Sequence, residues 1–541
     1  MMRRLALLAL TAGLLPAQVP FQRILNADQE PRNWLTYSGS NMSQRYSRLT
    51  QITPENVKNL ELQWVFQARS LEKFEATPLV VDGVLYTVQA PNDVIALDAV
   101  TGREFWSYSY SPSPQSRPCC GRVNRGVAIV NNTLFMGTID AHLIAIDATN
   151  GRPLWNTEVA KAESGYAITH APEVIKDKVI VGVAGGEFGI RGFIAAYDVH
   201  TGKEVWRFHT IPAPGEPGHE TWSGDSWKTG GASVWVTGSY DPALNLTYWG
   251  IGNAGPDYNG DVRKGDNLYT SCVVALDADT GRLKWYYQFS PHDEFDYDAV
   301  QIPVLADLQW KGQPRKVMLW ANRNGFFYVL DRATGQFLLG KPFVEVNWAN
   351  GFDEKGRPMR VPGKVPTPEG TVIFPGNQGG TNWYSPSFSP ATGLFYIPSW
   401  VNYSSVYVKA PAEYEEGRRY LGASPRSLIG GLQQAKINTR KPGEGYGAVR
   451  AIDPQTGERK WEFKMNDVTD AGILTTASNL LFSGGREGYF YALDARTGEL
   501  LWKGAVGGAV ASGPMSYAVH GRQYVAISAG SALFVYALRG Q

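Results

Sequence analysis

The sequence predicts an all-β protein that forms a single closed β-propeller of about eight blades. A turn phrase with an aspartate and a glycine recurs along the chain, and a tryptophan follows most copies at a fixed offset. Most copies lie about 40–50 residues apart, which is the length of one four-stranded blade. The composition agrees, because 59 Gly, 17 Trp, 27 Tyr and 22 Phe among 541 residues are typical of many short strands joined by tight turns.

The repeated turn phrase predicts a β-hairpin in each blade. Its aspartate and threonine side chains can hydrogen-bond to the turn backbone, and its glycine can adopt a positive φ. Apolar runs flank each copy, as residues 94–97 and 103–106 flank the first. The seven clear copies begin at Asp98, Asp147, Asp198, Asp277, Asp331, Asp453 and Asp494. Six of them lead to a tryptophan that we expect to pack against a neighbouring blade, namely Trp106, Trp155, Trp206, Trp285, Trp461 and Trp502, whereas Leu339 takes this place after Asp331.

The distances between the copies predict the number of blades. Successive copies are 49, 51, 79, 54, 122 and 41 residues apart, and the intervals of 79 and 122 residues are too long for one blade. Each long interval contains a looser copy of the phrase, which begins at Asp241 in the first and at Ser389 in the second. Seven clear and two looser copies indicate seven to nine units, and therefore about eight blades. Closure of the ring would also remove exposed strand edges.

The repeat favours one domain over residues 19–541, although the length alone would suggest three or four domains. Two long insertions, 209–230 and 404–446, are expected to form functional or mobile loops. Residues 410–420 within the second insertion are compatible with a helix.

Residues 1–18 predict a secretory signal peptide. Arg3 and Arg4 precede an uncharged apolar run over 5–15, and Ala17 is a small residue suited to cleavage. An uncleaved membrane anchor is the alternative, but the run is shorter than the ~20 residues that a span requires. We therefore expect a periplasmic protein without a stable membrane span. A net charge of +1 argues against nucleic-acid binding, and a count of 3 Cys argues against a scaffold held together by disulfides. The sequence leaves open whether the protein forms a homodimer.

Several motifs outside the repeat resemble one family of enzymes. They are Asn33-Trp34, Tyr37-Ser-Gly-Ser40, Arg45-Tyr-Ser47, the adjacent Cys119-Cys120 followed by Val123-Asn-Arg-Gly126, Gly265-Asp-Asn-Leu268 and Pro291-His-Asp-Glu-Phe-Asp-Tyr-Asp298. Together with the repeated tryptophan turn, these motifs resemble the PQQ-dependent alcohol and methanol dehydrogenases, which are secreted quinoproteins with an eight-bladed propeller. The motifs are specific because they occur in the family's order from about residue 33 to the C-terminus.

The resemblance implies a binding site for PQQ. In the family an adjacent cysteine pair forms a disulfide against one face of the cofactor, and Trp235 matches the tryptophan that stacks on the other face. From the residues alone, two reduced buried thiols and a tryptophan of a blade core are the alternatives, and Cys272 is expected in the core. Ala184 stands where some members place a serine that contacts the cofactor. The cofactor-binding residues that the resemblance implies are Glu75, Cys119, Cys120, Arg125, Thr169, Gly185, Gly186, Ser233, Trp235, Arg323, Asn382 and Trp383.

The same resemblance implies a metal site formed by Glu187, Asn253 and Asp296, which offer the oxygen ligands that a hard cation requires. Asp298 occupies the position at which lanthanide-using members carry an aspartate and calcium enzymes usually carry an uncharged residue. On an extended segment, Asp296 and Asp298 would point the same way. With Glu187 they would supply three carboxylates, which balance a trivalent cation better than a divalent one. The alternative is that Asp298 is a solvated loop carboxylate beside a calcium site.

The implied reaction is oxidation of a primary alcohol to the aldehyde by hydride transfer to PQQ, with a lanthanide or calcium ion as Lewis acid. Asp296 would be the general base, with Glu187 as the weaker candidate, and Arg323 would stabilise charge that develops on the cofactor. No Cys-x-x-Cys-His motif occurs, so we expect electrons to pass to a separate acceptor such as a c-type cytochrome. Two alternatives remain: a calcium-dependent quinoprotein dehydrogenase of another alcohol or polyol, and a non-catalytic propeller that scaffolds envelope-protein assembly.

Overall fold

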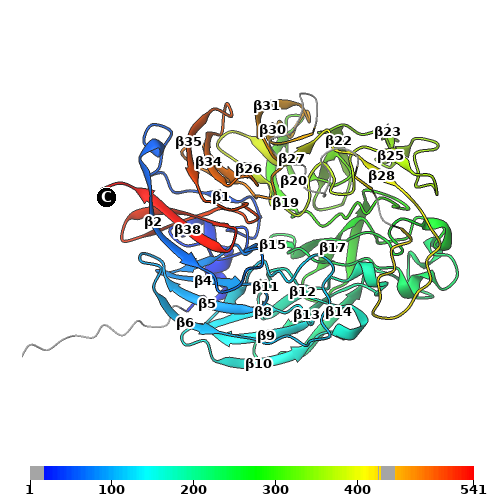
Figure 1. Cartoon of the computed structure of the whole chain (residues 1–541), viewed down its shortest axis with the longest axis horizontal. Coiled ribbons are helices and arrows are strands. Elements are labelled where there is room, and N and C mark those ends of the chain that lie inside the picture. Colours follow the sequence, from blue (N-terminus) through cyan, green and yellow to red (C-terminus); the bar gives the residue numbers. More distant parts are fainter. Residues whose placement is uncertain (1–17, 424–425, 428–444, 541) are drawn as a thin grey trace, which may run out of the picture.

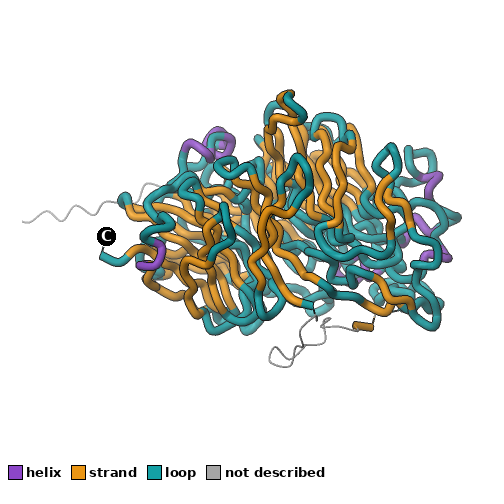
Figure 2. The backbone as a smooth tube through the Cα atoms, turned by 90° about the horizontal axis from the view of Figure 1, so that it is seen from above, coloured by secondary structure: helices purple, strands orange, loops and turns teal. Residues whose placement is uncertain are grey.

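The chain forms an eight-bladed β-propeller, as predicted, in a computed structural model that describes residues 18–423, 426–427 and 445–540. Eight sheets, each with four antiparallel strands, surround a common axis (Figure 1). Strands make up most of the regular structure, and the helical segments are short (Figure 2). The predicted signal peptide lies outside the described residues except for Gln18. No helix within the described part is long and apolar enough to cross a membrane.

The first five blades follow one another along the chain. Blade 1 contains β3 (Leu79–Val81), β4 (Val84–Gln89), β5 (Asp93–Asp98) and β6 (Glu104–Tyr108). Blade 2 contains β7 (Ala128–Val130), β8 (Thr133–Gly137), β9 (His142–Asp147) and β10 (Pro153–Glu158). Blade 3 contains β11 (Glu173–Ile175), β12 (Lys178–Gly182), β13 (Phe193–Asp198) and β14 (Glu204–His209). Blade 4 contains β15 (Ser239–Asp241), β16 (Leu246–Gly250), β17 (Cys272–Asp277) and β18 (Leu283–Gln288), and blade 5 contains β19 (Val304–Trp310), β20 (Gln313–Ala321), β21 (Phe326–Asp331) and β22 (Phe337–Pro342).

The last three blades include insertions and the closure of the ring. Blade 6 contains β26 (Ser387–Ser389), β27 (Leu394–Val401), β30 (Tyr446–Ile452) and β31 (Arg459–Lys464). Blade 7 contains β32 (Leu474–Thr476), β33 (Leu480–Gly484), β34 (Tyr489–Asp494) and β35 (Leu500–Ala505), with β1 (Tyr46–Ser47) parallel to β32. Blade 8 contains β36 (Met515–Val519), β37 (Arg522–Ala529), β38 (Ala532–Leu538) and β2 (Leu60–Gln67). Because β2 pairs with β38, the two ends of the chain close the ring.

Smaller elements lie outside the blades. Two small sheets pair β23 (Ala349–Phe352) with β24 (Pro358–Arg360), and β25 (Thr371–Ile373) with β28 (Ser405–Tyr407) and β29 (Arg426–Ser427). The α-helix α1 spans Phe21–Leu25. The 3-10 turns are η1 (Ala27–Gln29), η2 (Val57–Asn59), η3 (Ala162–Ser164), η4 (Gly186–Phe188), η5 (His219–Thr221), η6 (Ser226–Thr229) and η7 (Gly260–Val262).

The tryptophan after a turn docks on the turn of the next blade, as the repeat predicts. Trp106 Nε1 donates a hydrogen bond of 3.2 Å to the carbonyl oxygen of Ala148, the residue after Asp147. Gly151 in that turn has φ +76°, and a Cβ there would lie 2.6 Å from the Trp106 ring. Glycine is therefore required both by the turn and by the indole above it. The same donor–carbonyl contact measures 3.1–3.3 Å for Trp155, Trp206, Trp285 and Trp461.

The two looser copies of the phrase hold a different position from the one we predicted. The clear copies join the third and fourth strands of a blade, whereas the copies at Asp241 and Ser389 join the first and second strands, β15–β16 and β26–β27. The intervals of 79 and 122 residues therefore each hold one blade that is enlarged by insertions, and not two units. The eighth blade has no copy of its own because the N-terminal β2 supplies its outer strand.

Residues 410–420 do not form a helix, although their sequence is compatible with one. Their backbone groups contact other loops: Ala410 N donates to Gly422 O at 2.7 Å, and Tyr420 N donates to Glu187 O at 2.7 Å. These long-range bonds replace the bonds that a helix would make within itself. The segment 409–423 instead forms a strap, and it contacts loops of blades 3 and 4.

The antiparallel order of the strands separates two kinds of loop. Turns between first and second strands, and between third and fourth strands, lie at one end of each blade. The loops from second to third strands, and from one blade to the next, lie at the opposite end. All residues of the predicted site belong to this second set of loops or to the segment before β3. The repeat thus builds one end of the propeller, and non-repeating loops build the end that holds the site.

Candidate active site

A cavity of about 430 Å³ lies at the end of the propeller that carries the non-repeating loops. The predicted residues that line it are Glu75, Cys119, Cys120, Arg125, Thr169, Gly185, Glu187, Trp235, Asp296, Asp298, Arg323, Asn382 and Trp383. The three predicted residues Gly186, Ser233 and Asn253 do not line the cavity and lie beside it. Ser233 Oγ and Asn253 Oδ1 stand 3.1 and 3.8 Å from the position that a Cβ of Gly186 would take. The fold therefore brings the whole predicted set to one place, although it is scattered over 300 residues of sequence.

The backbone adopts uncommon conformations at two of these residues. Gly185 has φ +117°, and a Cβ there would lie 2.2 Å from Gly165 O, so only glycine permits this close approach. Asp296 has φ +59°, a conformation that costs a non-glycine residue about 1–3 kcal/mol. The segment 296–298 is therefore not the extended strand from which we expected its two aspartates to point the same way. Their carboxylates nevertheless converge, because both meet the same guanidinium.

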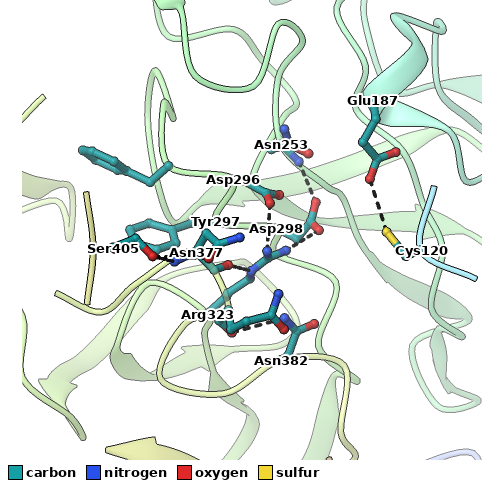
Figure 3. Close-up of polar contacts among 12 residues, drawn as sticks. Cys120, Glu187, Asn253, Asp296, Tyr297, Asp298, Arg323, Asn377, Asn382 and Ser405 are labelled. Carbon is teal, nitrogen blue, oxygen red and sulfur yellow. Dashed lines mark hydrogen bonds and ion pairs between the residues drawn. The ribbon is translucent and has the colours of Figure 1, made fainter. Parts of the chain in front are cut away.

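Arg323 holds Asp296 and Asp298 together (Figure 3). Its Nη1 lies 2.7 Å from Asp298 Oδ2 and its Nη2 lies 2.9 Å from Asp296 Oδ2, while its Nε donates to Asn377 O at 2.7 Å. Asp298 Oδ1 accepts a hydrogen bond of 2.9 Å from Asn253 N. Arg323 and both aspartates are largely buried, so these charge-assisted bonds are well shielded from water.

Cys119 and Cys120 form a disulfide between adjacent residues, in agreement with the interpretation drawn from the resemblance. Cys120 Sγ lies 3.9 Å from Glu187 Oε1, and Figure 3 shows that carboxylate pointing toward the sulfur. The strap 409–423 covers this corner, because Arg419 Nη2 donates to Cys119 O at 2.9 Å. Cys272 is fully buried in β17, as expected of a core residue.

Arg125 contacts both aromatic residues of the predicted cofactor site. Its guanidinium carbon lies 5.1 Å from the ring centre of Trp235 and 4.4 Å from that of Trp383. Its Nη2 forms a buried ion pair of 2.9 Å with Glu75 Oε2, and its Nη1 donates to Thr169 Oγ1 at 3.0 Å. Arg125 Nε is buried and has no hydrogen-bond partner among the described residues. A donor left unpaired in this way is suited to a ligand carboxylate.

Burial raises the pKa of three neighbouring carboxyl groups in this cavity, those of Glu187, Asp296 and Asp298. For Glu187, burial is the main cause, and the charge of Asp298 adds to it. The pKa of Asp296 is raised well above its usual value by burial and by Asp298 and Glu187, although Arg323 opposes the shift. The pKa of Asp298 is raised by burial despite Arg323. Burial lowers the pKa of Arg323, but the two aspartates raise it more, so it stays charged. These carboxylates lack a sufficient counter-charge, which a bound cation would supply.

Sequence reasoning missed several residues of the cavity, including three pairs. Asp257 and Tyr258 follow Asn253 in the same loop, and Tyr258 Oη donates to Asp296 Oδ2 at 3.2 Å. Arg419 and Leu421 reach the cavity from the strap, and the ion pair of Arg486 with Asp470 lies at its edge. Only the position of Asp257, four residues after a predicted ligand, offered a signal in the sequence. The others are placed by contacts between distant loops.

The oxygen ligands of the predicted metal site are not drawn tightly together. Among the described His, Cys, Asp and Glu residues, only Cys119, Cys120 and Glu187 place three ligand-type atoms within 4.8 Å of one another. Because two of these atoms are disulfide sulfurs, this group is not a ligand set. The guanidinium of Arg323 instead lies between Asp296 and Asp298. The carboxylate and amide oxygens still match a hard cation in chemical type.

Known proteins resemble this chain over nearly its whole length. Residues 34–350 match the family model for the glucose/ethanol/alcohol dehydrogenase β-propeller domain, and residues 445–538 match the model for the outer membrane protein assembly factor BamB. The chain is 40% identical over 544 residues to quinohemoprotein alcohol dehydrogenase ADH IIB of Pseudomonas putida, covering 97% of this chain and 77% of that one. It is 37% identical over 531 residues to 1-butanol dehydrogenase (cytochrome c) of Thauera butanivorans, covering 92% and 74%. A europium-containing methanol dehydrogenase structure superimposes with a TM-score of 0.89 at 35% identity, covering 96% of this chain and 100% of that chain.

Proposed function

The chain belongs to the PQQ-dependent alcohol dehydrogenases, and on that premise we propose that it oxidises a primary alcohol to the aldehyde in the periplasm. The observation that carries this proposal is the single cavity that gathers the adjacent disulfide, Trp235, two arginines and the pair Asp296–Asp298. A binding propeller has no need of buried carboxylates around a strained aspartate.

The cavity fits PQQ in chemical type. A flat tricarboxylated quinone needs apolar faces and cationic edges, and the disulfide and Trp235 offer the faces. Arg125 offers the unpaired Nε, and Thr169, Asn382 and Trp383 lie along the same wall. When bound, PQQ would supply the acceptor for the hydride of the alcohol, and the cation would supply a Lewis acid.

Glu187, Asn253, Asp296 and Asp298 are the residues that we propose to hold the cation. A lanthanide is the ion that we favour, because Asp298 adds a carboxylate that a calcium site does not need. The europium-containing relative supports this choice.

Asp296 is the group that we propose to take the hydroxyl proton of the alcohol. Burial raises its pKa, and a carboxylate with a raised pKa accepts a proton more readily. Tyr258 Oη and Arg323 Nη2 both donate to its Oδ2, so the carboxylate is held in one orientation and its Oδ1 is left to meet the cation and the substrate hydroxyl. Arg323, fixed by Asn377 O, provides positive charge beside the reacting atoms without moving.

Reconstitution tests the proposal. Cofactor-free protein is incubated with PQQ and either La³⁺ or Ca²⁺, and dye-linked oxidation is measured over a panel of primary alcohols, polyols and aldehydes. We expect activity only when PQQ and a metal ion are both present, with La³⁺ giving the higher rate. No activity with either metal on any alcohol would refute the proposal. Reduction of an added c-type cytochrome by the active enzyme would identify the class of electron acceptor, which the cytochrome-linked relative suggests.

The match of residues 445–538 to an envelope assembly factor favours a second candidate, a scaffold that binds other envelope proteins. This match covers β30 to β38 and none of the predicted site residues, which end at Trp383. A visible absorption band of bound quinone in the holoprotein would exclude a purely scaffolding role.

A further inference from the structure

Asp257 is a buried carboxylate of the cavity that the proposed reaction leaves without a role. It is 2% exposed, it lines the cavity, and its Oδ1 has no hydrogen-bond partner among the described residues. The charged groups that act on it are Asp296, Glu187 and Asp298, and Asn253 is its side-chain neighbour. All four are the residues that we propose as ligands of the cation.

Hydrogen bonds hold the backbone on both sides of Asp257. Arg263 donates to Pro256 O from Nε at 3.2 Å and from Nη2 at 3.0 Å, and its Nη2 also donates to Asp293 O at 2.6 Å. On the other side, Tyr258 N donates to Leu421 O at 2.9 Å. No cation among the described residues forms an ion pair with the Asp257 carboxylate.

The charge of the site depends on this residue. Glu187, Asp296 and Asp298 supply three negative charges when ionised, and Arg323 between the two aspartates and Arg419 near Glu187 offset part of them. Two further arginines of the cavity are engaged elsewhere, since Arg125 pairs with Glu75 and Arg486 pairs with Asp470. An ionised Asp257 adds one negative charge to the site, and this charge attracts a trivalent ion more strongly than a divalent one.

We propose that Asp257 is a fourth carboxylate of the cation site and that it makes the site favour trivalent over divalent ions. This inference rests on the proposed function, because it requires a cation between Glu187 and Asp296. A carboxylate attracts a cation in proportion to the charge of that cation. The binding free energy lost on removal of Asp257 is therefore larger for a trivalent ion than for a divalent ion, in the ratio of their charges.

The test compares Asp257→Asn with Asp261→Asn in the PQQ-loaded protein. Asp261 is on the same loop, its side chain is 64% exposed, and it pairs with Lys409 at the surface, so it is a matched control. Dissociation constants are measured for Tb³⁺ by luminescence and for Ca²⁺ by calorimetry. We expect Asp257→Asn to raise the dissociation constant of Ca²⁺ about 10-fold and that of Tb³⁺ about 30-fold. The logarithms of the two changes stand in the ratio of the ionic charges, 2 to 3. Asp261→Asn changes neither, and Asp257→Glu restores the preference for Tb³⁺.

A second measurement needs no bound metal. A cooperative melting transition of the metal-free Asp257→Asn protein, close to that of the wild type, shows that the variant folds. Unchanged Tb³⁺ affinity, or equal weakening of both ions, overturns the inference. So does an altered KM for alcohols with unaltered metal affinity, which would make Asp257 a substrate contact. A wild-type protein that binds neither ion in the presence of PQQ overturns the proposed function as well.

Discussion

Replacement of Gly281 by alanine tests the contact that locks each blade to the next. Gly281 ends the repeated turn of blade 4 at φ +68°, and a Cβ there would lie 2.4 Å from Cε3 of Trp206 in blade 3. The indole is 8% exposed, and its Nε1 donates to Ala278 O, so it cannot withdraw from the added methyl group without breaking this bond. The substitution therefore strains both the turn and the blade interface.

Gly393 allows the two effects to be separated. It has φ +70° in a turn of similar sequence, but no atom lies within 4 Å of the position that its Cβ would take. The left-handed backbone costs alanine about 1–2 kcal/mol at either position. Overpacking against Trp206 adds about 1–3 kcal/mol at Gly281 alone. We expect Gly281→Ala to lose about 2–5 kcal/mol of stability and Gly393→Ala about 1–2 kcal/mol.

Thermal unfolding of both variants at one scan rate, with circular dichroism at the strand signal, provides the comparison. Gly281→Ala should melt below Gly393→Ala, and Gly393→Ala should melt slightly below the wild type. Equal melting temperatures for the two variants would refute the reasoning, because they would mean that the indole contact adds nothing to the interface. A Gly393→Ala protein less stable than Gly281→Ala would contradict it even more directly.

Three further predictions concern the cavity and its supporting core. Asp298→Ala should abolish La³⁺-supported alcohol oxidation and leave Ca²⁺-supported oxidation largely intact, which the two dye-linked rates measure; loss of both rates would mean that Asp298 serves another role. Arg125→Lys should weaken PQQ binding by about tenfold or more in a fluorescence titration, because lysine lacks the fork that binds a carboxylate and the flat face that packs between Trp235 and Trp383; unchanged affinity would remove Arg125 from the cofactor site. Burial raises the pKa of Glu173 to about 8, so the folded state holds a proton that the unfolded chain releases above its ordinary pKa, and stability falls as the pH rises from about 4.5 to 8. Glu173→Gln, which keeps an acceptor for Thr247 Oγ1, should therefore melt above the wild type by a margin that grows from pH 5 to pH 8, and a constant margin would contradict the assignment.

The blades could be predicted from the sequence because the physics that forms them is local. An aspartate, a glycine and a tryptophan at fixed offsets specify a hairpin and its contact with the next blade. Most clear copies carry the same three residue types. The looser copies at Asp241 and Ser389 extended the predicted number of units to nine, because a similar turn also joins the first two strands of a blade. What distinguishes them is their place between the first and second strands of a blade, which only the assembled ring reveals.

The site residues were recognisable by resemblance, but their mutual arrangement was not. Asp296 and Asp298 were expected on an extended segment, whereas φ +59° at Asp296 turns the chain and Arg323 joins the two carboxylates. Asp257 and the strap residue Arg419 carry no motif that we recognised. Their positions follow from ring closure and from contacts between loops that are more than 100 residues apart in the case of Arg419.

The two ends of the propeller contribute to the stability of the fold in opposite ways, and the stabilising end makes the destabilising site possible. At the end built by the repeat, glycines meet indoles and each turn satisfies its own polar groups, so every blade adds stability. At the other end, Asp296 has a strained backbone, and buried carboxylates with raised pKa values oppose folding until a cation neutralises them. The ring tolerates this cost because closure by β2 makes all eight blades support one another. It follows that cation binding should stabilise the whole ring, and that a blade-interface variant such as Gly281→Ala should recover part of its lost stability when the metal is added.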